Sequence, residues 1–440
     1  MTISIAVVGS GPSGFYAIEA LLKKLPDCRV DLIDRIPAPF GLVRYGVAPD
    51  HEKTRNVTRA YRRVFDKGDV RYYGNVDLGR DIALDDLRGA YDAVVLATGA
   101  SGDRIIAIPG SNLPQVYGAA SFVGWYNGHP DHVDLAPDIA CRAIAVIGNG
   151  NVALDVARIL SKSRAELAAT DIAPHALEAI DAAAIETVWI CGRRGPIEGS
   201  FTKPELGEMG DLARAVALVR RDQLPDAMPP LAGTPYDSRS YNMRRANLDI
   251  LRRFAGNRPG EKPGQVRFEF FASPRAILGK DRVSGLRLER TRLQNGKAVG
   301  TGETFDIDVG CVISSIGYKG LPIDGAPYDE WKGTIPNKEG HVDGTLYVVG
   351  WAKRGPSGTI PTNRKDSFAV VDQLVAGVAD GGRPGRRWLD ACLAEKGIRR
   401  TTFDDWLTIE AAEIAAATPP APRRRFTTIE GMLSVLPPNG

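Results

Sequence analysis

The sequence predicts an α/β protein made of two Rossmann-like dinucleotide-binding domains. The prediction rests on residues 3–22 and residues 143–160, where an apolar run leads into a glycine-rich turn and then into a helical pattern. A match to G-x-G-x-x-G or G-x-G-x-x-A indicates a dinucleotide site when it lies between a strand and a helix in this way. The length of 440 residues is also typical of two or three domains.

The first glycine-rich turn follows an apolar run that is typical of a buried parallel strand. It contains Gly9, Gly11 and Gly14. In this motif the first glycine permits the tight turn, the second lets the backbone approach a pyrophosphate, and the third lets the helix lie close to the strand. The next predicted strand ends at Asp34, whose carboxylate can accept hydrogen bonds from a ribose diol. The first module is therefore expected to bind the ADP-ribose part of a dinucleotide.

The second turn spans residues 148–153, and Ala153 stands in place of the third glycine, which the motif tolerates. The predicted strand that follows, residues 187–191, leads to Arg193 and Arg194 and to no acid. A carboxylate suits a 2′-hydroxyl group, whereas arginine suits a 2′-phosphate through bidentate, charge-assisted hydrogen bonds. The first site thus fits FAD or NAD, and the second fits NADP(H).

Two stretches after the first module also carry information. Residues 35–51 contain prolines and glycines that forbid a regular helix, and their apolar content predicts a shaped loop that lines a ligand site. Residues 53–65 predict a helix with an apolar face and a face that carries Arg55, Arg59, Arg62 and Arg63. That arginine face is either simply solvated or a docking surface for an acidic partner.

The remaining elements follow from periodicity and turn residues. Strands are expected at residues 70–76, 91–100, 266–271, 276–278, 283–293 and 311–318, with Asn295-Gly296 as a hairpin turn. Helices are expected within residues 161–186, over 243–254 with Arg244, Arg245, Arg252 and Arg253 exposed, and over 363–378. The Pro- and Arg-rich tail, residues 419–440, is expected to run over the surface.

One short stretch carries paired carboxylates. Glu205 and Glu208 would share one face if residues 201–209 are helical, although the pattern alone indicates solvated charge. A second stretch, the Gly- and Pro-rich loop before residue 363, leads into a helix whose N-terminus could point at an electron-rich ring.

Composition excludes several classes of function. The net charge of +3 is too small to indicate nucleic-acid or membrane binding. No apolar run reaches the roughly 18 residues of a membrane span, and glycines interrupt the N-terminal run, which is predicted to be a strand rather than a signal peptide. The five cysteines are odd in number and widely spaced, which argues against a disulfide scaffold, an iron–sulfur or zinc site and a dithiol active site. No metal site is expected, and the expected location is a reducing cytoplasm.

Taken together, these motifs resemble the adrenodoxin reductase family, and most closely its bacterial NADPH–ferredoxin reductases. The resemblance spans nearly the whole chain and rests on residues 9–14, 39–51, 148–153, 192–196, 201–209 and 350–362. It implies FAD in the first site, NADPH in the second, and an NADP domain inserted into the FAD domain. The expected boundaries are residues 1–102 and 321–440 for the FAD domain with its C-terminal tail, and residues 103–320 for the NADP domain.

The resemblance also implies roles for individual residues. It places His51 and Glu208 near the nicotinamide as the catalytic pair, and Glu205 near the nicotinamide-side ribose. Arg104, residues 149–152, Arg193 and Arg194 should contact NADP, and Trp351 with residues 358–360 should lie along the flavin, Gly358 also near the nicotinamide. The full set of expected cofactor-binding residues is Gly9, Gly11, Pro12, Ser13, Gly14, Asp34, Leu42, Val76, Thr98, Gly99, Arg104, Asn149, Gly150, Asn151, Val152, Arg193, Arg194, Glu205, Trp351, Gly358, Thr359 and Ile360.

The activity that the resemblance implies is that of a ferredoxin–NADP(+) reductase of the adrenodoxin reductase type. NADPH passes a hydride to FAD, and the flavin then passes single electrons to a ferredoxin, an acidic iron–sulfur protein that can supply a cytochrome P450. A monomer is expected. Three alternatives remain open: a disulfide reductase, which needs a dithiol beside the flavin; an oxygen-using flavin monooxygenase; and a non-catalytic redox sensor.

Overall fold

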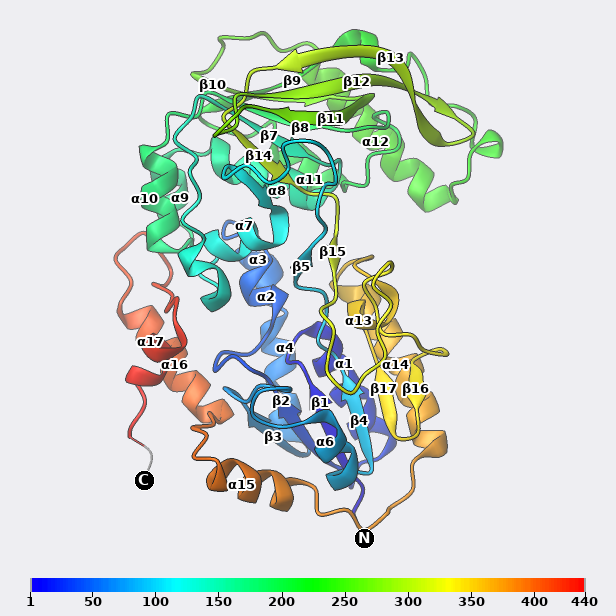
Figure 1. Ribbon diagram of the computed structural model, residues 1–440, viewed down its shortest axis with the longest axis vertical. Helices are drawn as coiled ribbons and strands as arrows, with labels where there is room; N and C mark the ends of the chain where they lie inside the picture. The colour runs from blue at the N-terminus through cyan, green and yellow to red at the C-terminus, as the bar shows by residue number, and fades with distance from the viewer. Residues whose placement is uncertain (1, 439–440) are drawn as a thin grey trace. The chain divides into compact units, whose positions relative to one another are not determined.

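The structure is a computed structural model that describes residues 2–438. The described chain divides into two compact units, which Figure 1 shows as ribbons. Unit 1 contains the described residues within Met1–Gly102, Asn127–Val133 and Tyr318–Gly440, and unit 2 contains Asp103–Tyr126 and Asp134–Gly317. Each unit is built on its own six-stranded sheet of mainly parallel strands. The predicted α/β class with two Rossmann-like domains is therefore confirmed.

The sheet of unit 1 consists of β1 (Ser4–Val8), β2 (Arg29–Ile33), β3 (Asp69–Tyr73), β4 (Ala93–Leu96), β16 (His341–Asp343) and β17 (Leu346–Val348). Their spatial order is β16-β17-β4-β1-β2-β3, and all neighbours are parallel except the β16–β17 pair. All five residues of β1 are buried, as expected of a central parallel strand that is covered on both faces.

The helices of unit 1 cover both faces of this sheet. They are α1 (Pro12–Lys24), α2 (Leu42–Tyr45), α3 (Glu52–Arg55), α4 (Thr58–Arg62), α5 (Val64–Lys67), α6 (Leu84–Ala90), α13 (Trp351–Arg354), α14 (Ile360–Gly377), α15 (Arg386–Glu395), α16 (Phe403–Ala415) and α17 (Ile429–Ser434). Because side chains alternate along a strand, Ile5 and Val7 pack with α1, α14 and α16, whereas Ala6 and Val8 pack with α6 and α15.

The large sheet of unit 2 has the order β6-β14-β7-β8-β10-β9 and is parallel throughout. Its strands are β6 (Val116–Gly118), β7 (Ala143–Ile147), β8 (Thr187–Cys191), β9 (Ala215–Val219), β10 (Gly264–Glu269) and β14 (Cys311–Ser314). The helices of unit 2 are α7 (Ala119–Tyr126), α8 (Asn151–Ser161), α9 (Arg164–Ala168), α10 (Pro174–Ala182), α11 (Lys203–Glu208) and α12 (Ser238–Phe254).

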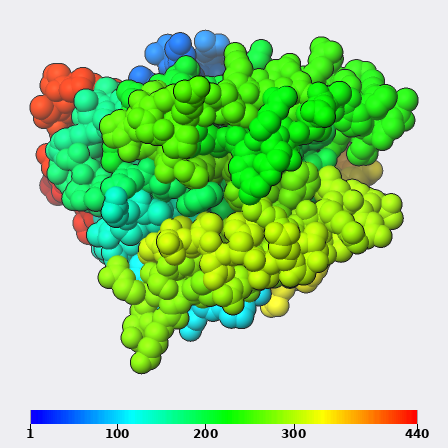
Figure 2. All heavy atoms as spheres, turned by 90° about the horizontal axis from the view of Figure 1, so that it is seen from above, coloured from blue at the N-terminus to red at the C-terminus, as the bar shows by residue number. Residues whose placement is uncertain are grey.

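A second, antiparallel sheet covers the other face of the large sheet in unit 2. It consists of β11 (Ala272–Leu278), β12 (Gly285–Gln294) and β13 (Lys297–Ile307). Leu286 and Leu288 of β12 pack with Ala145 and Ile147 of β7 in one apolar cluster. The outer sides of β12 and β13 lie at the surface, where their atoms are yellow-green in Figure 2. Asn295 and Gly296 both have positive φ angles, 52° and 72°, so the predicted hairpin turn is confirmed.

Three shorter elements complete the description. β5 (Gly102–Asp103) and β15 (Tyr318–Lys319) form a separate two-stranded sheet. Single 3-10 turns lie at Pro130–Leu135, Arg221–Gln223 and Leu231–Gly233. Within residues 2–438, no helix combines the length and the apolar character needed to cross a membrane.

The structure corrects the prediction of one helix over residues 53–65. The stretch forms three short helices, α3, α4 and α5, because bonds from Arg59 to the Asn56 carbonyl and from Ala60 to the Val57 carbonyl tighten the turns between them. The predicted arginine face is also divided. Arg62 pairs with Glu410, and Arg55 binds the side chain of Asn127, so only Arg59 and Arg63 of the four arginines remain exposed.

Other predictions need correction too. Residues 161–186 form two helices, α9 and α10, rather than one. Within α12, Arg244 is half-buried because it donates to the carbonyl oxygens of Ile197 and Gly199, and Arg252 is half-buried beside the Pro225 carbonyl.

As far as residue 438, most of the C-terminal tail lies at the surface as expected, but Arg425, Met432 and Leu436 anchor it in the interior. Met432 of α17 is fully buried, and Leu436 is buried beside it in the core of unit 1. Arg425 is buried as well and donates to the backbone carbonyl of Asn127 at 3.1 Å. Prolines and arginines predicted exposure here. Arg424 is indeed exposed and Arg423 pairs with Glu410, whereas the guanidinium group of Arg425 lies in the interior and donates to backbone oxygens.

Candidate functional site

The first glycine-rich turn joins β1 to α1 and depends on three glycines. Gly9 has a φ angle of 107°, and a Cβ atom there would lie 2.5 Å from the Ala97 carbonyl oxygen. A Cβ atom at Gly14 would lie 2.1 Å from the Gly9 carbonyl oxygen. At Gly11, by contrast, a Cβ atom would meet nothing within 4 Å. The turn is therefore tightly packed at Gly9 and Gly14. It is open at Gly11, where a pyrophosphate could approach the start of α1 at Pro12.

Asp34 follows β2 and is held rigidly beside the turn. One carboxylate oxygen accepts hydrogen bonds from the Ser10 N–H at 2.8 Å and the Ser10 hydroxyl at 2.5 Å. The other accepts from the Ile36 N–H at 3.0 Å. Val76 is fully buried behind it and donates its N–H to the Asp34 carbonyl. A carboxylate has about four acceptor positions, so three internal bonds fix the side chain and leave capacity for a ribose hydroxyl.

The loop over residues 35–51 folds back onto the same turn. The Phe40 N–H donates to the Ser10 carbonyl at 3.0 Å, and a Cβ atom at Gly41 would lie 3.1 Å from the Gly11 Cα atom. Leu42, which begins α2, is half-buried next to this contact. The loop therefore borders the place where the sequence predicts a ligand.

The end of β17 brings a late part of the chain to this turn. A Cβ atom at Gly350 would lie 2.0 Å from the Ser13 hydroxyl, and Ser367 of α14 donates to the Ser13 carbonyl at 3.0 Å. The Trp351 indole N–H donates to the Ser357 carbonyl at 3.1 Å, which fixes the ring at the edge of the loop before α14.

The residues expected along a flavin lie in that loop and its neighbours. Gly358 and Thr359 are exposed, and Ile360 begins α14. Thr98 and Gly99 follow β4, and a Cβ atom at Gly99 would meet nothing within 4 Å. Since parallel strands end at one edge of the sheet, β1, β2, β4 and β17 bring all these groups to a common edge in unit 1.

In the loop over residues 35–51, Arg44 is held in place by an ion pair in the interior. Arg44 of α2 and Glu413 of α16 form a buried bidentate pair, with one N–O distance of 3.0 Å. Burial alone would lower the pKa of Arg44, but the Glu413 carboxylate outweighs burial, and the pKa is raised. Glu413 also accepts from the Phe426 N–H at 2.9 Å, which anchors the C-terminal tail to the same pair. No local pattern predicts this contact, because the two residues are 369 positions apart.

Residues 127–133 add a second support to unit 1. The side chain of Asn127 donates to the Tyr45 carbonyl at 3.1 Å, and the rings of Tyr45 and His129 are 4.7 Å apart. Arg35, next to the ribose acid, pairs with Asp131 at 2.8 Å. Burial lowers the pKa of His129 to about 3, although the Asp131 carboxylate acts in the opposite direction. His51 occupies the N-cap position of α3 in the same unit, without a capping hydrogen bond from its side chain, and is half-buried.

The second glycine-rich turn joins β7 to α8 in unit 2. Gly148 has a φ angle of 149°, and a Cβ atom there would lie 2.3 Å from the Ser315 carbonyl oxygen. Gly150 caps α8, which then begins with Asn151 and Val152. The Asn149 side-chain amide is buried, and neither its nitrogen nor its oxygen has a hydrogen-bond partner among the described residues. Buried amides are normally bonded, so this turn fits a nucleotide that would supply the partner.

Two arginines follow β8 next to this turn. Arg193 and Arg194 are exposed, and their guanidinium groups form no hydrogen bond or ion pair within the described chain. Their backbone is fixed, since Thr291 donates to the Arg193 carbonyl at 2.7 Å and Phe271 donates to the Arg194 carbonyl at 3.2 Å. Rigid backbone and unpaired guanidinium groups are the arrangement that a phosphate monoester requires.

Part of the stretch over residues 201–209 is helical, as α11, so Glu205 and Glu208 lie one helical turn apart. The Thr202 N–H donates to the Asn151 side chain at 2.8 Å, so α11 begins beside the nucleotide turn. Glu205 and Glu208 are half-buried, and Glu208 pairs with the buried Arg158 of α8 at 3.2 Å. Arg158 was not predicted, because an arginine in an amphipathic helix gives no sign of being buried.

The remaining residue that is expected to contact NADP, Arg104, lies where unit 2 begins. Its N–H donates to the Gly317 carbonyl at 3.2 Å, and Gly317 has a φ angle of 114°. Arg104 is therefore close to the end of β14, which runs beside β7.

Two kinds of site depend on particular side chains: a dithiol site needs paired thiols, and a metal site needs a cluster of metal-ligating side chains. All five cysteines are unpaired, and unit 1 contains only Cys28, which is buried, and Cys392. Burial raises the pKa of the Cys28 thiol to about 11, which makes it a poor nucleophile. Among residues 2–438, no group of three or more His, Cys, Asp or Glu side chains could hold a metal ion.

Comparison with known proteins agrees with this geometry. A model of the pyridine nucleotide-disulphide oxidoreductase family matches residues 3–190. The chain is 40% identical to human mitochondrial NADPH:adrenodoxin oxidoreductase over 99% of this chain and 92% of that protein. It is 40% identical to NADPH-ferredoxin reductase FprA of Mycobacterium leprae over 98% of each. The structure of Mycobacterium tuberculosis FprA in complex with NADPH matches with a TM-score of 0.93 and 38% identity over 99% of both chains. The chain therefore belongs to the family of adrenodoxin reductases and NADPH-ferredoxin reductases.

Proposed function

We propose that this protein is an NADPH–ferredoxin reductase that holds FAD in unit 1 and NADPH in unit 2. The observation that carries the proposal is the difference between the two strand ends. Asp34 is positioned for a ribose diol, whereas Arg193 and Arg194 present unpaired guanidinium groups that suit a 2′-phosphate. FAD, when bound, supplies the chemistry, because it accepts a hydride and can release its electrons singly.

In this proposal unit 1 is the FAD domain, and unit 2, which ends at Gly317 rather than at the expected residue 320, is inserted into it as the NADP domain. The open backbone at Gly11 would take the pyrophosphate, and Asp34 would take the ribose. Trp351 and the loop before α14 would border the ring system. In unit 2, the Asn149 amide and the start of α8 would hold the NADPH pyrophosphate, and the two arginines would hold its 2′-phosphate.

The role of the protein in hydride transfer is mainly to position two rings. We assign His51 and Glu208 to the nicotinamide and Glu205 to its ribose. Glu208 forms an ion pair with the buried Arg158, which restricts the positions that its carboxylate can take. Positioning of this kind can supply several kcal/mol of barrier reduction, so neither residue needs to act as an obligatory base.

The electron acceptor in this proposal is an acidic ferredoxin, which can in turn supply a cytochrome P450. Of the arginines in residues 53–65, Arg59 and Arg63 remain available for docking. Complementary charge accelerates such encounters and is screened by salt. The protein is proposed to act as a monomer in the cytoplasm, where its unpaired cysteines would stay reduced.

The test is an absorbance experiment on the purified protein under anaerobic conditions. The protein should be yellow, NADPH should bleach the flavin, and oxidised ferredoxin should restore the colour without any thiol. A colourless protein after reconstitution with FAD, or a flavin that NADPH leaves oxidised, would contradict the proposal. Hydroxylation of a small substrate coupled to oxygen would instead identify a monooxygenase.

Ferredoxin docking is tested separately by salt and by substitution. Raising the ionic strength should weaken ferredoxin binding, and Arg59→Ala/Arg63→Ala should weaken it further while leaving flavin reduction unchanged. The exposed pair of α12, Arg245→Ala/Arg253→Ala, is the matched variant on the other unit. Binding that salt leaves unaffected would argue against electrostatic docking.

A further inference from the structure

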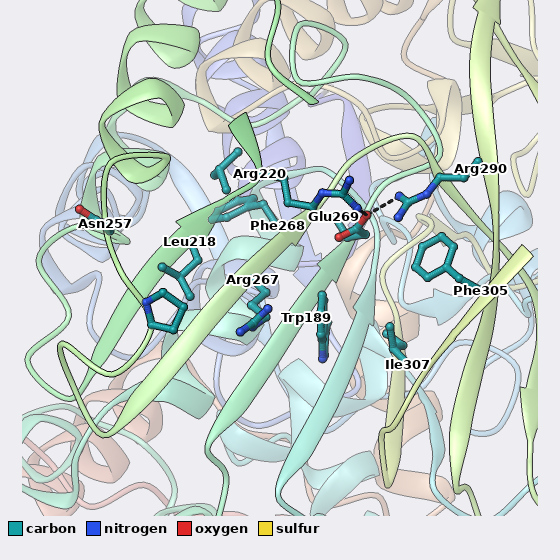
Figure 3. A pocket seen from close by; sticks show the side chains of 12 residues that line it. Trp189, Leu218, Arg220, Asn257, Arg267, Phe268, Glu269, Arg290, Phe305 and Ile307 are labelled. Atoms are coloured by element: carbon teal, nitrogen blue, oxygen red, sulfur yellow. Dashed lines mark hydrogen bonds and ion pairs between the residues drawn. The ribbon is translucent and has the colours of Figure 1, made fainter. Parts of the chain in front are cut away.

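Unit 2 contains a pocket that the proposed function does not use. It has a volume of about 380 Å³ and lies between one face of the large sheet and the antiparallel strands β12 and β13 (Figure 3). Pockets for small ligands typically measure about 300–1,000 Å³. Trp189, Leu218 and Arg267 come from the large sheet, and Phe305 and Ile307 come from β13. The pocket is therefore large enough for a small organic molecule.

The floor of the pocket is a single row of side chains across three strands. Arg267 of β10 pairs in register with Trp189 of β8 on one side and with Leu218 of β9 on the other. Directly paired residues of parallel strands project from the same face of a sheet. A guanidinium group thus lies in the middle of an otherwise apolar row, and Figure 3 shows it beside the Trp189 ring.

The charges around the pocket do not balance. Arg290 pairs with Glu269, and Arg220 pairs with Asp222 at 3.1 Å. Arg267 has no carboxylate within ion-pair distance among the described residues, and its contact is the Trp189 ring, whose centroid is 5.2 Å from the guanidinium carbon. Arg267 is half-buried, so its guanidinium group is partly shielded from water and is available to an anionic ligand.

The opposite wall of the pocket is aromatic and cationic as well. Arg290 lies over the Phe305 ring, with its guanidinium carbon 3.8 Å from the centroid. Ile307 is buried next to it. The walls therefore offer flat apolar surfaces, and the one unneutralised charge is positive.

From these features we propose that the pocket binds a small organic anion, specifically a carboxylate attached to a flat apolar body. The carboxylate pairs with Arg267, and the flat body lies between the row of Trp189 and Leu218 and the Phe305 wall. None of the lining residues belongs to a glycine-rich turn, and neither Arg193 nor Arg194 lines the pocket. The inference stands independently of the proposed redox function.

The test uses calorimetric titration of the FAD-loaded protein in the presence of saturating NADP+, which keeps the nucleotide site filled. The probe is 2-naphthoate, and two matched compounds separate its features. 2-Naphthalenemethanol keeps the flat body without the charge, and acetate keeps the charge without the body. We expect saturable binding of one naphthoate per chain, with each matched compound bound at least about tenfold more weakly, as expected for loss of a charged hydrogen bond or of apolar contact.

Substitution locates the site. Arg267→Met keeps the apolar stem and removes the charge, and it should weaken naphthoate binding by about tenfold or more. Arg292→Met is the matched control, because Arg292 is an exposed arginine of β12 outside the pocket. Thermal unfolding and NADPH-dependent flavin reduction should be unchanged in both variants, which shows that they fold.

Several results would overturn the inference. These are the absence of saturable binding at millimolar naphthoate, equal affinity in the Arg267→Met variant, or binding that disappears when NADP+ is present. Failure of flavin reduction by NADPH would bear on the proposed function and leave the naphthoate titration interpretable.

Discussion

The two glycine-rich turns share one backbone plan and differ in how their surroundings are built. Around the turn of unit 1, the polar groups already have internal partners: Asp34 accepts three hydrogen bonds, and the Phe40 N–H is bonded to Ser10. Around the turn of unit 2, the Asn149 amide is unsatisfied and Arg193 and Arg194 are unpaired. A preorganised site whose polar groups already have partners suits a group that stays bound, and a site with unpaired charged groups suits a molecule that exchanges.

The preorganisation of the site in unit 1 depends most on the buried ion pair of Arg44 and Glu413. Glu413→Gln would leave Arg44 buried without a counter-charge, and breaking such a pair costs about 3–5 kcal/mol. We expect urea unfolding of unit 1, followed by FAD release, to shift to lower denaturant. NADP+ affinity in unit 2 should be unchanged.

The control for this variant is Glu395→Gln, at an exposed position of α15. It should unfold like the unmodified protein. If Glu413→Gln retained FAD and unfolded normally, the buried pair would not be what fixes the loop at residues 35–51.

Substituting Arg193 and Arg194 tests whether their unpaired charges bind the nucleotide in unit 2. Arg193→Ala/Arg194→Ala should weaken NADP+ binding on the order of a hundredfold, because charge-assisted bonds to the phosphate are lost. NAD+, which lacks that phosphate, should bind almost as before. Calorimetry measures both affinities, with Arg292→Ala as the control for loss of an exposed arginine. An equal loss for both nucleotides would contradict the assignment.

The support given by residues 127–133 should make unit 1 sensitive to pH. The ordinary pKa of His129 is 6.5, and burial lowers it to about 3 in the folded protein. The unfolded chain therefore takes up a proton below about pH 6.5 that the folded chain refuses, so stability is full at neutral pH and falls as the pH decreases. The loss should be about 2 kcal/mol between about pH 7 and about pH 5, at about 1.4 kcal/mol per pH unit below the ordinary pKa.

The measurement is urea unfolding of the unmodified protein and of His129→Asn at several pH values. Asparagine can still accept the Asp131 N–H bond that His129 accepts at 3.1 Å, but it does not titrate. The variant should lose less stability on acidification. Parallel curves for the two proteins would show that His129 is not responsible.

The smallest expected effect concerns the residues assigned to the nicotinamide. His51→Ala and Glu208→Ala should each slow flavin reduction by about tenfold through loss of positioning, while FAD retention stays the same. Stopped-flow absorbance gives the rate, and Glu303→Gln, at an exposed position of β13, is the control. Unchanged reduction rates would remove both residues from the site.

Local sequence patterns were sufficient to predict those parts of the fold that are formed by neighbouring residues in the chain. The glycine spacing predicted both turns, and the chemistry of Asp34 and of Arg193 with Arg194 predicted different ligands, because strand, turn and helix lie within about thirty residues of sequence. The role assigned to the two half-buried glutamates in α11 came from the family resemblance, since their spacing alone indicated solvated charge.

Contacts between distant parts of the chain could not be predicted in this way. Arg44 meets Glu413, and residues 127–133 belong to unit 1 although their sequence neighbours belong to unit 2. The tail over residues 419–438 was expected at the surface because its arginines are polar, yet Arg425 is buried and donates to the Asn127 carbonyl. Side-chain pairing decides such cases, and composition does not reveal the partner.

The most direct measurement of the difference between the two sites is retention during gel filtration. The protein is saturated with FAD and NADP+, passed through a desalting column, and analysed for both nucleotides. We expect one FAD to be retained per chain and NADP+ to be lost to the buffer. Retained NADP+ together with lost FAD would contradict the account, because the tightly held nucleotide would then be in unit 2 and the exchanging one in unit 1.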